Sequence, residues 1–256
     1  MTRPRILAAA VVLIAAIGIG GYVAYDQVLR GDSLAPLALP SSAPATSDTG
    51  AASDPSAATT ASPVSGISAD PASGSSDIAG TWSATTGSQA GYRVREQLAN
   101  LPAESDAVGR TDQVSGTITV TTDGSTSSVT AGTIQVDTTS IASDKSQRDN
   151  RLRTEGLQTD TYPTATFTLT QPVDIPAAAI SGTGSDVTLV GDLTIHGVTK
   201  SVQIPAQAQL ASGTIQVAGS ISFALSDYGM TAPNIGGFIV SIADQGTLEF
   251  VVVFGR

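Results

Sequence analysis

The feature that most constrains the fold is a period-two alternation of apolar and polar residues between positions 187 and 206. Over residues 187–195 the apolar side chains fall on alternate positions, which is the pattern of a β-strand with one buried face and one face in water. The alternation resumes over residues 202–206, after His196 and Gly197, and glycine adopts the backbone conformations that tight turns require. The stretch therefore predicts a β-hairpin, and antiparallel pairing of long strands as the basis of the fold.

Shorter runs of the same kind, separated by turn residues, fill most of residues 79–256. They lie at residues 80–84, 92–96, 114–121, 129–136, 164–169, 214–225 and 248–254. Short strands at this spacing favour an antiparallel β-sandwich or a closed barrel over alternating strands and helices. One stretch, residues 143–157, has helical character and carries much of the positive charge of this region. We interpret it as a short helical insertion that forms a charged lid.

The N-terminus predicts a membrane anchor. Arg3 and Arg5 precede an uncharged apolar run over residues 6–25, which as a helix is long enough to cross the roughly 30 Å of a bilayer core. We therefore assign residues 1–30 to an anchor with a transmembrane helix at about residues 6–25. The arginines before the run place the N-terminus in the cytoplasm and the rest of a single-pass protein outside it. Secretion after cleavage of a signal peptide is the alternative, although no Ala-x-Ala-like cleavage site stands out.

Residues 31–78 predict a linker. This segment consists mainly of Ala, Ser, Thr, Pro, Gly and Asp, with almost no large apolar side chain and no Lys or Arg. Such a composition cannot bury enough apolar surface to offset the entropy of the chain. We expect a disordered tether that gives the folded domain, residues 79–256, reach from the membrane.

Charge and composition exclude several classes of function. The net charge of −10 disfavours nucleic-acid binding, which depends on clustered Lys and Arg. The chain has no cysteine, so disulfides, cysteine-based zinc sites and covalent c-type haem attachment are excluded. A single histidine and scattered carboxylates do not form a metal-ligand cluster. We therefore predict neither a metal nor any other cofactor.

Three motifs then resemble the YceI-like family. They are RDNRLR at residues 148–153, YPTATF at residues 162–167 and GDLTIHGVTK at residues 191–200. An early Trp82 and the run 226–229, SDYG, agree in order, so that the resemblance spans residues 79–256. Members of that family are extended, lipocalin-like antiparallel barrels that bind polyisoprenoid or similar amphiphilic lipids in an apolar interior.

The resemblance implies an all-β fold, namely an eight-stranded antiparallel barrel with a short helical insertion. It also implies non-enzymatic binding of an amphiphilic, polyisoprenoid-like lipid outside the cytoplasm, by a carrier, buffer or transfer protein. An eight-stranded barrel can be packed solid or can hold one small ligand, and medium-sized inward side chains favour the second state. The candidate cavity residues are Val120, Ile134, Val136, Phe167, Leu189, Leu193, Ile195, Val217, Phe223, Phe250 and Val252.

The basic residues of the insertion are candidates for binding a polar head group. Arg148, Arg151 and Arg153 carry planar guanidinium groups that match phosphate oxygens. In the alternative interpretation Arg148 pairs with a carboxylate of a neighbouring strand, and the other two arginines lie in water.

We assign no catalytic residue. His196 has Asp192 four residues before it, but no Gly-x-Ser-x-Gly pattern marks a nucleophile. The alternative function is a solid-core barrel at the cell surface, which contacts a protein or polysaccharide through loops such as residues 232–238. The sequence does not predict an oligomeric state.

Overall fold

The computed structural model describes residues 34–40, 78–98, 104–232 and 239–256. Within these residues eleven strands form one sheet. The strands are β1 (Gly80–Ala84), β2 (Gln89–Leu98), β3 (Glu104–Thr111), β4 (Val114–Asp123), β5 (Thr126–Asp137), β6 (Thr164–Leu169), β7 (Val173–Ile175), β8 (Ser185–Ile195), β9 (Val198–Ala211), β10 (Thr214–Ala224) and β11 (Ile239–Gly255). The helical elements are η1 (Thr138–Ser140), α2 (Ser146–Arg151), η2 (Leu152–Gly156), α3 (Ala177–Ile180) and η3 (Leu225–Tyr228).

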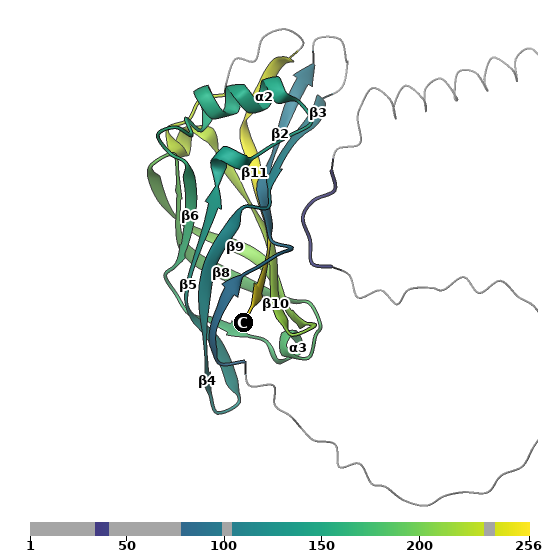
Figure 1. The fold of residues 1–256 in the computed structure, drawn as a ribbon, viewed down its shortest axis with the longest axis vertical. Helices are drawn as coiled ribbons and strands as arrows, with labels where there is room; N and C mark the ends of the chain where they lie inside the picture. Colours follow the sequence, from purple (N-terminus) through teal and green to yellow (C-terminus); the bar gives the residue numbers. More distant parts are fainter. Residues whose placement is uncertain (1–33, 41–77, 99–103, 233–238) are drawn as a thin grey trace, which may run out of the picture.

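The sheet closes into an elongated barrel (Figure 1). β2 pairs with β3 while β1 pairs with β4, so β1–β2 and β3–β4 act as two long, interrupted strands lying side by side. β5, β6, β8, β9, β10 and β11 follow in order, each antiparallel to the one before it. β11 then pairs with both β1 and β2, which closes the barrel. The predicted eight-stranded antiparallel barrel with a short helix is confirmed.

The hairpin of β8 and β9 has the predicted turn. Ile195 pairs with Val198, which leaves His196 and Gly197 as a two-residue loop. Both residues have positive φ, +51° and +73°, as the hairpin turn that matches the twist of the strands requires.

β9 and β10 pair over only part of their length. The paired residues run from Ala206–Gly219 to Ala211–Thr214, and no described strand pairs with residues 198–205 on the β10 side. The next pair along would join Ser220 to Pro205, which has no N–H to donate. Side chains after β10 cover this seam, because Tyr228 and Met230 are buried in one cluster with apolar residues of β8.

A core cluster of buried side chains lies where β1, β4, β10 and β11 come together. Trp82 belongs to this cluster together with Val120 and Phe254. The indole N–H of Trp82 donates to the carbonyl of Ile78 at 2.9 Å, and the Arg256 guanidinium lies 4.5 Å from the ring centre. Val120, predicted as a cavity residue, belongs to this packed core and is 1% exposed, because the aromatic side chains fill the space beside it.

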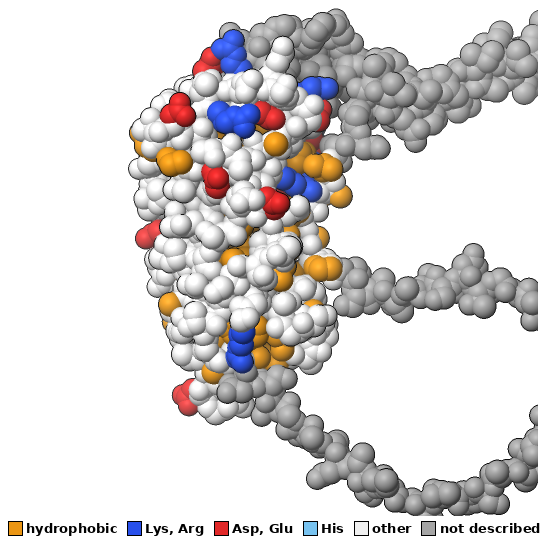
Figure 2. Space-filling view, in the orientation of Figure 1, with side chains coloured by type: hydrophobic (Ala, Val, Ile, Leu, Met, Phe, Trp, Pro, Cys, Tyr) orange, Lys and Arg blue, Asp and Glu red, His pale blue; other side chains and the backbone are white. Residues whose placement is uncertain are grey.

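The predicted helical insertion, residues 143–157, lies between β5 and β6 and forms α2 and η2. It covers the opposite end of the barrel from α3 (Figure 1). Figure 2 shows that, on the face in view, most charged side chains gather in the half of the molecule that carries α2. The rest of that wall is mainly uncharged, since Thr and Ser occupy many outward positions of strands such as β4 and β5.

The predicted anchor at residues 1–30 lies outside the described residues. In the described part of the chain, no helix is long and apolar enough to cross a membrane. The predicted disordered linker at residues 31–78 needs a correction at residues 34–40, which contact the outer wall of the barrel. The composition of the whole linker concealed three leucines concentrated in this short stretch.

Gly197 and Gly124 permit a matched test of the hairpin turns. Both have positive φ, but a Cβ on Gly197 would lie 2.6 Å from Cε1 of Tyr162, whereas a Cβ on Gly124 would meet nothing within 4 Å. We expect Gly124→Ala to lower the free energy of unfolding by about 1 kcal/mol, the backbone cost alone. We expect Gly197→Ala to lower it by roughly 2–4 kcal/mol. Urea unfolding of both variants measures the difference, and equal losses would contradict a steric role for Tyr162.

Candidate functional site

The barrel encloses a cavity of about 270 Å³ with an almost entirely apolar lining. Its lining extends from α3 to the segment that contains α2 and η2, and alternate residues of the strands point into it. Ten of the eleven predicted cavity residues line it: Ile134, Val136, Phe167, Leu189, Leu193, Ile195, Val217, Phe223, Phe250 and Val252. Only Val120 does not. The period-two pattern therefore identified the inner face of the strands, while ligand binding by these residues stays a prediction.

The structure adds cavity residues that the sequence analysis missed. Tyr92 and Val94 of β2 line the cavity. Three further lining residues, Ile141, Leu152 and Leu157, come from the segment that contains α2 and η2. Alternation at residues 92–96 carried a signal for the first two, because apolar and charged residues take turns there. The insertion gave no such signal, since its apolar residues are few and irregularly spaced. It supplies part of the cavity wall as well as charge.

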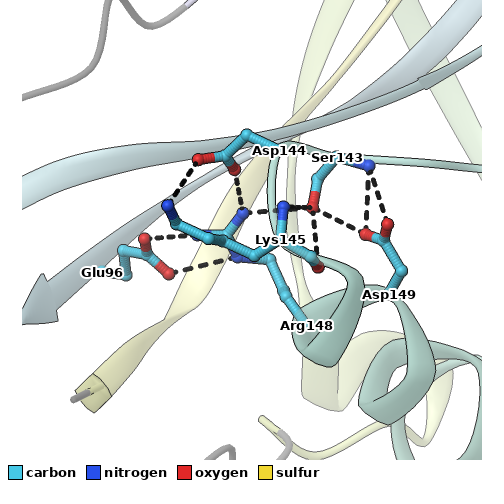
Figure 3. Close-up of polar contacts among 6 residues, drawn as sticks. All are labelled: Glu96, Ser143, Asp144, Lys145, Arg148 and Asp149. Carbon is cyan, nitrogen blue, oxygen red and sulfur yellow. Dashed lines mark hydrogen bonds and ion pairs between the residues drawn. The ribbon is translucent and has the colours of Figure 1, made fainter.

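Arg148 is the centre of a buried polar network that fixes α2 to the barrel (Figure 3). Its Nε and Nη2 donate to the two carboxylate oxygens of Glu96 on β2, at 3.3 and 2.5 Å. Its Nη1 donates to Asp144 at 2.6 Å and to the hydroxyl of Ser143 at 3.1 Å. Asp149 in turn accepts from the backbone N–H and the hydroxyl of Ser143.

Charge pairing in this network outweighs burial. Burial acts to lower the pKa of Arg148, but its hydrogen bond with Asp144 and the charge of Glu96 raise that pKa above its ordinary value. Burial likewise acts to raise the pKa of Asp144, yet the hydrogen bond and charge of Arg148 lower it. Both groups therefore stay ionised at neutral pH, and ion pairs hold the insertion against the barrel.

The predicted head-group arginines all have partners within the chain. Arg148 lines the cavity, but two carboxylates already bind its guanidinium. Arg151 forms an exposed ion pair with Glu155, and Arg153 donates to the carbonyl of Thr139. This geometry matches the alternative interpretation for Arg148, in which it pairs with a carboxylate of a neighbouring strand. Binding of a head group by these arginines stays a prediction.

Tyr92 presents an unpartnered polar atom at the cavity. Its side chain lies in the lining, and its hydroxyl is buried without a hydrogen-bond partner among the described residues. Burial raises the pKa of Tyr92 to about 12, while the charge of Arg148 acts in the other direction. Buried hydroxyls are normally hydrogen-bonded, so this one lacks a bond that such a group usually makes.

His196 has a structural environment. Its Nδ1 is 3.2 Å from the carbonyl oxygen of Tyr228, and its ring centre lies 4.4 Å from that of Tyr162. Its Nε2 is buried without a partner in the described part of the chain. The imidazole thus joins the β8–β9 turn to η3, across the seam between β9 and β10. No hydroxyl or carboxylate of the described residues forms a hydrogen bond with it.

Comparison with known proteins agrees with this geometry. The profile of the YceI-like domain matches residues 83–254. Protein YceI of Escherichia coli is 37% identical over 75 residues, which cover 29% of this chain and 35% of that protein. A UPF0312 protein of Vibrio campbellii is 39% identical over 75 residues, covering 29% of this chain and 36% of the relative. The matched stretch thus spans about a third of the length of these relatives.

Among solved structures, a polyisoprenoid binding domain from Saccharophagus degradans, implicated in plant cell wall breakdown, has the same fold. It superposes with a TM-score of 0.52 at 20% sequence identity, over 70% of this chain and 99% of that domain. The profile match covers the barrel from β1 to β11, which includes all three motifs singled out in the sequence. The chain belongs to the YceI-like domain family.

Proposed function

We propose that the barrel binds an amphiphilic, polyisoprenoid-like lipid in its cavity, without catalysing a reaction on it. The apolar cavity carries the proposal, because a lining with so few polar groups selects for a hydrocarbon chain. Each Å² of apolar ligand surface removed from water contributes about 25 cal/mol. The description of the Saccharophagus degradans domain as polyisoprenoid binding supports the choice of lipid class.

The size of the cavity argues against the solid-core surface module. In proteins whose large core side chains have been replaced by alanine, each Å³ of remaining cavity lowers the free energy of unfolding by about 24 cal/mol. An empty cavity of about 270 Å³ would therefore cost about 6 kcal/mol, which is comparable to the whole stability of many domains. An apolar ligand restores the lost contacts. The loop suggested for the alternative, residues 232–238, lies almost wholly outside the described residues.

Tyr92 is the best candidate to bind the polar end of the lipid. Arg148 also lines the cavity, but carboxylates and a hydroxyl already bind its guanidinium. The side chain of Tyr92 lines the same cavity, and its buried hydroxyl has no hydrogen-bond partner among the described residues. A hydroxyl or carbonyl group of the ligand would complete its hydrogen bonding. This arrangement favours an uncharged or weakly charged head over one that needs several free arginines.

The location of the protein is a further part of this proposal. The predicted apolar helix at residues 6–25 would anchor the chain in the cell membrane, with the barrel outside the cytoplasm. A lipid-binding barrel in that position would act as a carrier, buffer or transfer protein for the membrane beside it. Support for the location comes from the sequence, since these residues lie outside the described part of the structure.

Mass spectrometry of organic extracts tests the proposal directly. We expect protein purified from bacteria to carry a prenyl lipid in near-stoichiometric amount, because the ligand fills space that would otherwise stay empty. An unrelated barrel, prepared in the same way, is the control. An empty extract, together with no binding of added prenyl lipid, would overturn the lipid-binding function and favour the surface module.

Two neighbouring residues of β8 give a matched test of the cavity. Leu189 lines the cavity, whereas Thr188 is exposed on the outer wall. We expect Leu189→Trp to lower the amount of co-purified lipid at least about tenfold, because the larger side chain occupies the ligand's space. We expect Thr188→Trp to leave it unchanged. Equal lipid content in the two variants, at similar melting temperatures, would show that the ligand lies elsewhere.

Tyr92 gives a prediction for the delipidated protein. Its pKa is raised to about 12 in the folded state, so above pH 10 the unfolded chain loses the tyrosine proton while the folded chain keeps it. The free energy of unfolding therefore falls as the pH rises from about 10 to about 12. Between about pH 9 and about pH 11.5 we expect the unsubstituted protein to lose roughly 2 kcal/mol more than Tyr92→Phe. Urea unfolding of both proteins at both pH values measures this difference. Equal losses of unfolding free energy in the two proteins would contradict a buried hydroxyl.

A further inference from the structure

The outer wall of the barrel carries a buried charge cluster, formed by Glu249 of β11, Arg110 of β3 and Arg93 of β2. Oε1 of Glu249 accepts from Nε and Nη2 of Arg110 at 3.1 and 2.7 Å, and lies 3.7 Å from Nη2 of Arg93. The neighbours of Glu249 in β11 pack into the core, so Glu249 points outward. Its side chain is nevertheless only 2% exposed. A carboxylate on the outside of a barrel is buried this deeply only if something covers it.

The cover includes residues 34–40, LAPLALP, which lie beside the barrel wall (Figure 1, purple). The backbone N–H of Leu37 donates to the second oxygen of Glu249 at 3.4 Å. Arg93 donates to the carbonyl of Leu34 at 2.5 Å, and Arg110 donates to the carbonyl of Ala35. The charge cluster thus binds both a backbone N–H group and backbone carbonyl groups of this segment.

The other end of the segment reaches β9. The side-chain amide of Gln209, which is 5% exposed, lies 3.5 Å from the carbonyl of Pro40 and also donates to Gln216 of β10. Leu39 lies against Gly184, where an added Cβ would be 3.5 Å from its Cδ1. Residues 34–40 therefore run from the β2–β3 side of the wall, past β11, to β9.

The wall beneath is suited to an extended apolar segment. Val251 of β11 and Ala218 of β10 are paired in register and face outward, yet both are buried. In the segment, the side chains of Leu37 and Leu39 are half-buried, while Ala38 between them is exposed. Two prolines restrict the backbone, which lowers the entropy lost when an extended segment binds. Backbone hydrogen bonds and alternate apolar contacts together resemble the way sheets bind extended peptides.

We propose that residues 34–40 are a docking segment for the outer wall of their own barrel, and that this contact shortens the tether. With the segment docked, only residues 26–33 separate the wall from the predicted transmembrane helix, and eight residues span at most about 28 Å. Undocked, residues 26–77 would separate them and could extend to about 180 Å. Docking thus shortens the longest possible distance between the barrel and the predicted transmembrane helix. This inference does not depend on lipid binding.

Spin-label distances in the full chain test the proposal. The chain has no cysteine, so Ala38→Cys and Ser115→Cys introduce the only two labelling sites, both exposed, one on the segment and one on β4. Double electron–electron resonance is expected to give one narrow distance distribution. Adding Leu37→Asp, which places a second carboxylate beside Glu249, is expected to broaden the distribution at least twofold. A broad distribution in the starting pair would overturn the proposal.

Leu34→Asp is the matched control, because the Leu34 side chain is 55% exposed and only its carbonyl is bound. We expect this variant to keep the narrow distribution, and both variants to keep the melting temperature of the barrel within a few degrees. Equal broadening by the two substitutions would contradict docking through Leu37. An equimolar mixture of chains that each carry one of the two labels shows whether the segment docks on its own barrel or on that of another copy. The same narrow distance in the mixture would mean that the segment docks on a second copy.

Discussion

Closure of the sheet is the constraint on which the rest of the molecule depends. β11 is the longest strand, and it pairs along one side with β10 and along the other with both β1 and β2. Because this closure leaves the barrel with an inside and an outside, the alternation of each strand assigns one set of side chains to the interior. The cavity follows from the size of those side chains, since most of its lining residues are aliphatic side chains of medium size.

Buried charge is used in this barrel to attach elements that the sheet itself does not hold. The ion pairs of Arg148 join the helical insertion to β2, and the cluster around Glu249 joins residues 34–40 to β2, β3 and β11. Ion pairs of this kind contribute little net stability compared with apolar packing, but they are specific, because removing one partner leaves a costly unpaired charge. They therefore fix position rather than add to the core.

Local periodicity predicted most of the barrel and most of the cavity wall. The β8–β9 hairpin and ten of the predicted lining residues follow from alternation alone, which is a property of each strand by itself. Val120 was misassigned because its surroundings depend on Trp82 and Phe254, which closure brings beside it. The partner of Arg148 lies 52 residues away in the sequence, and no local pattern indicates such a pair. Residues 34–40 were missed because an average over the linker hides a short apolar stretch, and because their binding surface exists only in the folded barrel.

The seam between β9 and β10 has a consequence for association between molecules. Residues 198–205 of β9 form a stretch of strand whose β10 side has no partner strand in the described part of the chain, and such edges can pair with another copy. Two residues oppose that outcome. Pro205 cannot donate a hydrogen bond to an added strand, and the exposed Lys200 would bring its charge against an incoming edge. β9 therefore carries both the unpaired edge and the two residues that protect this edge against edge-to-edge aggregation.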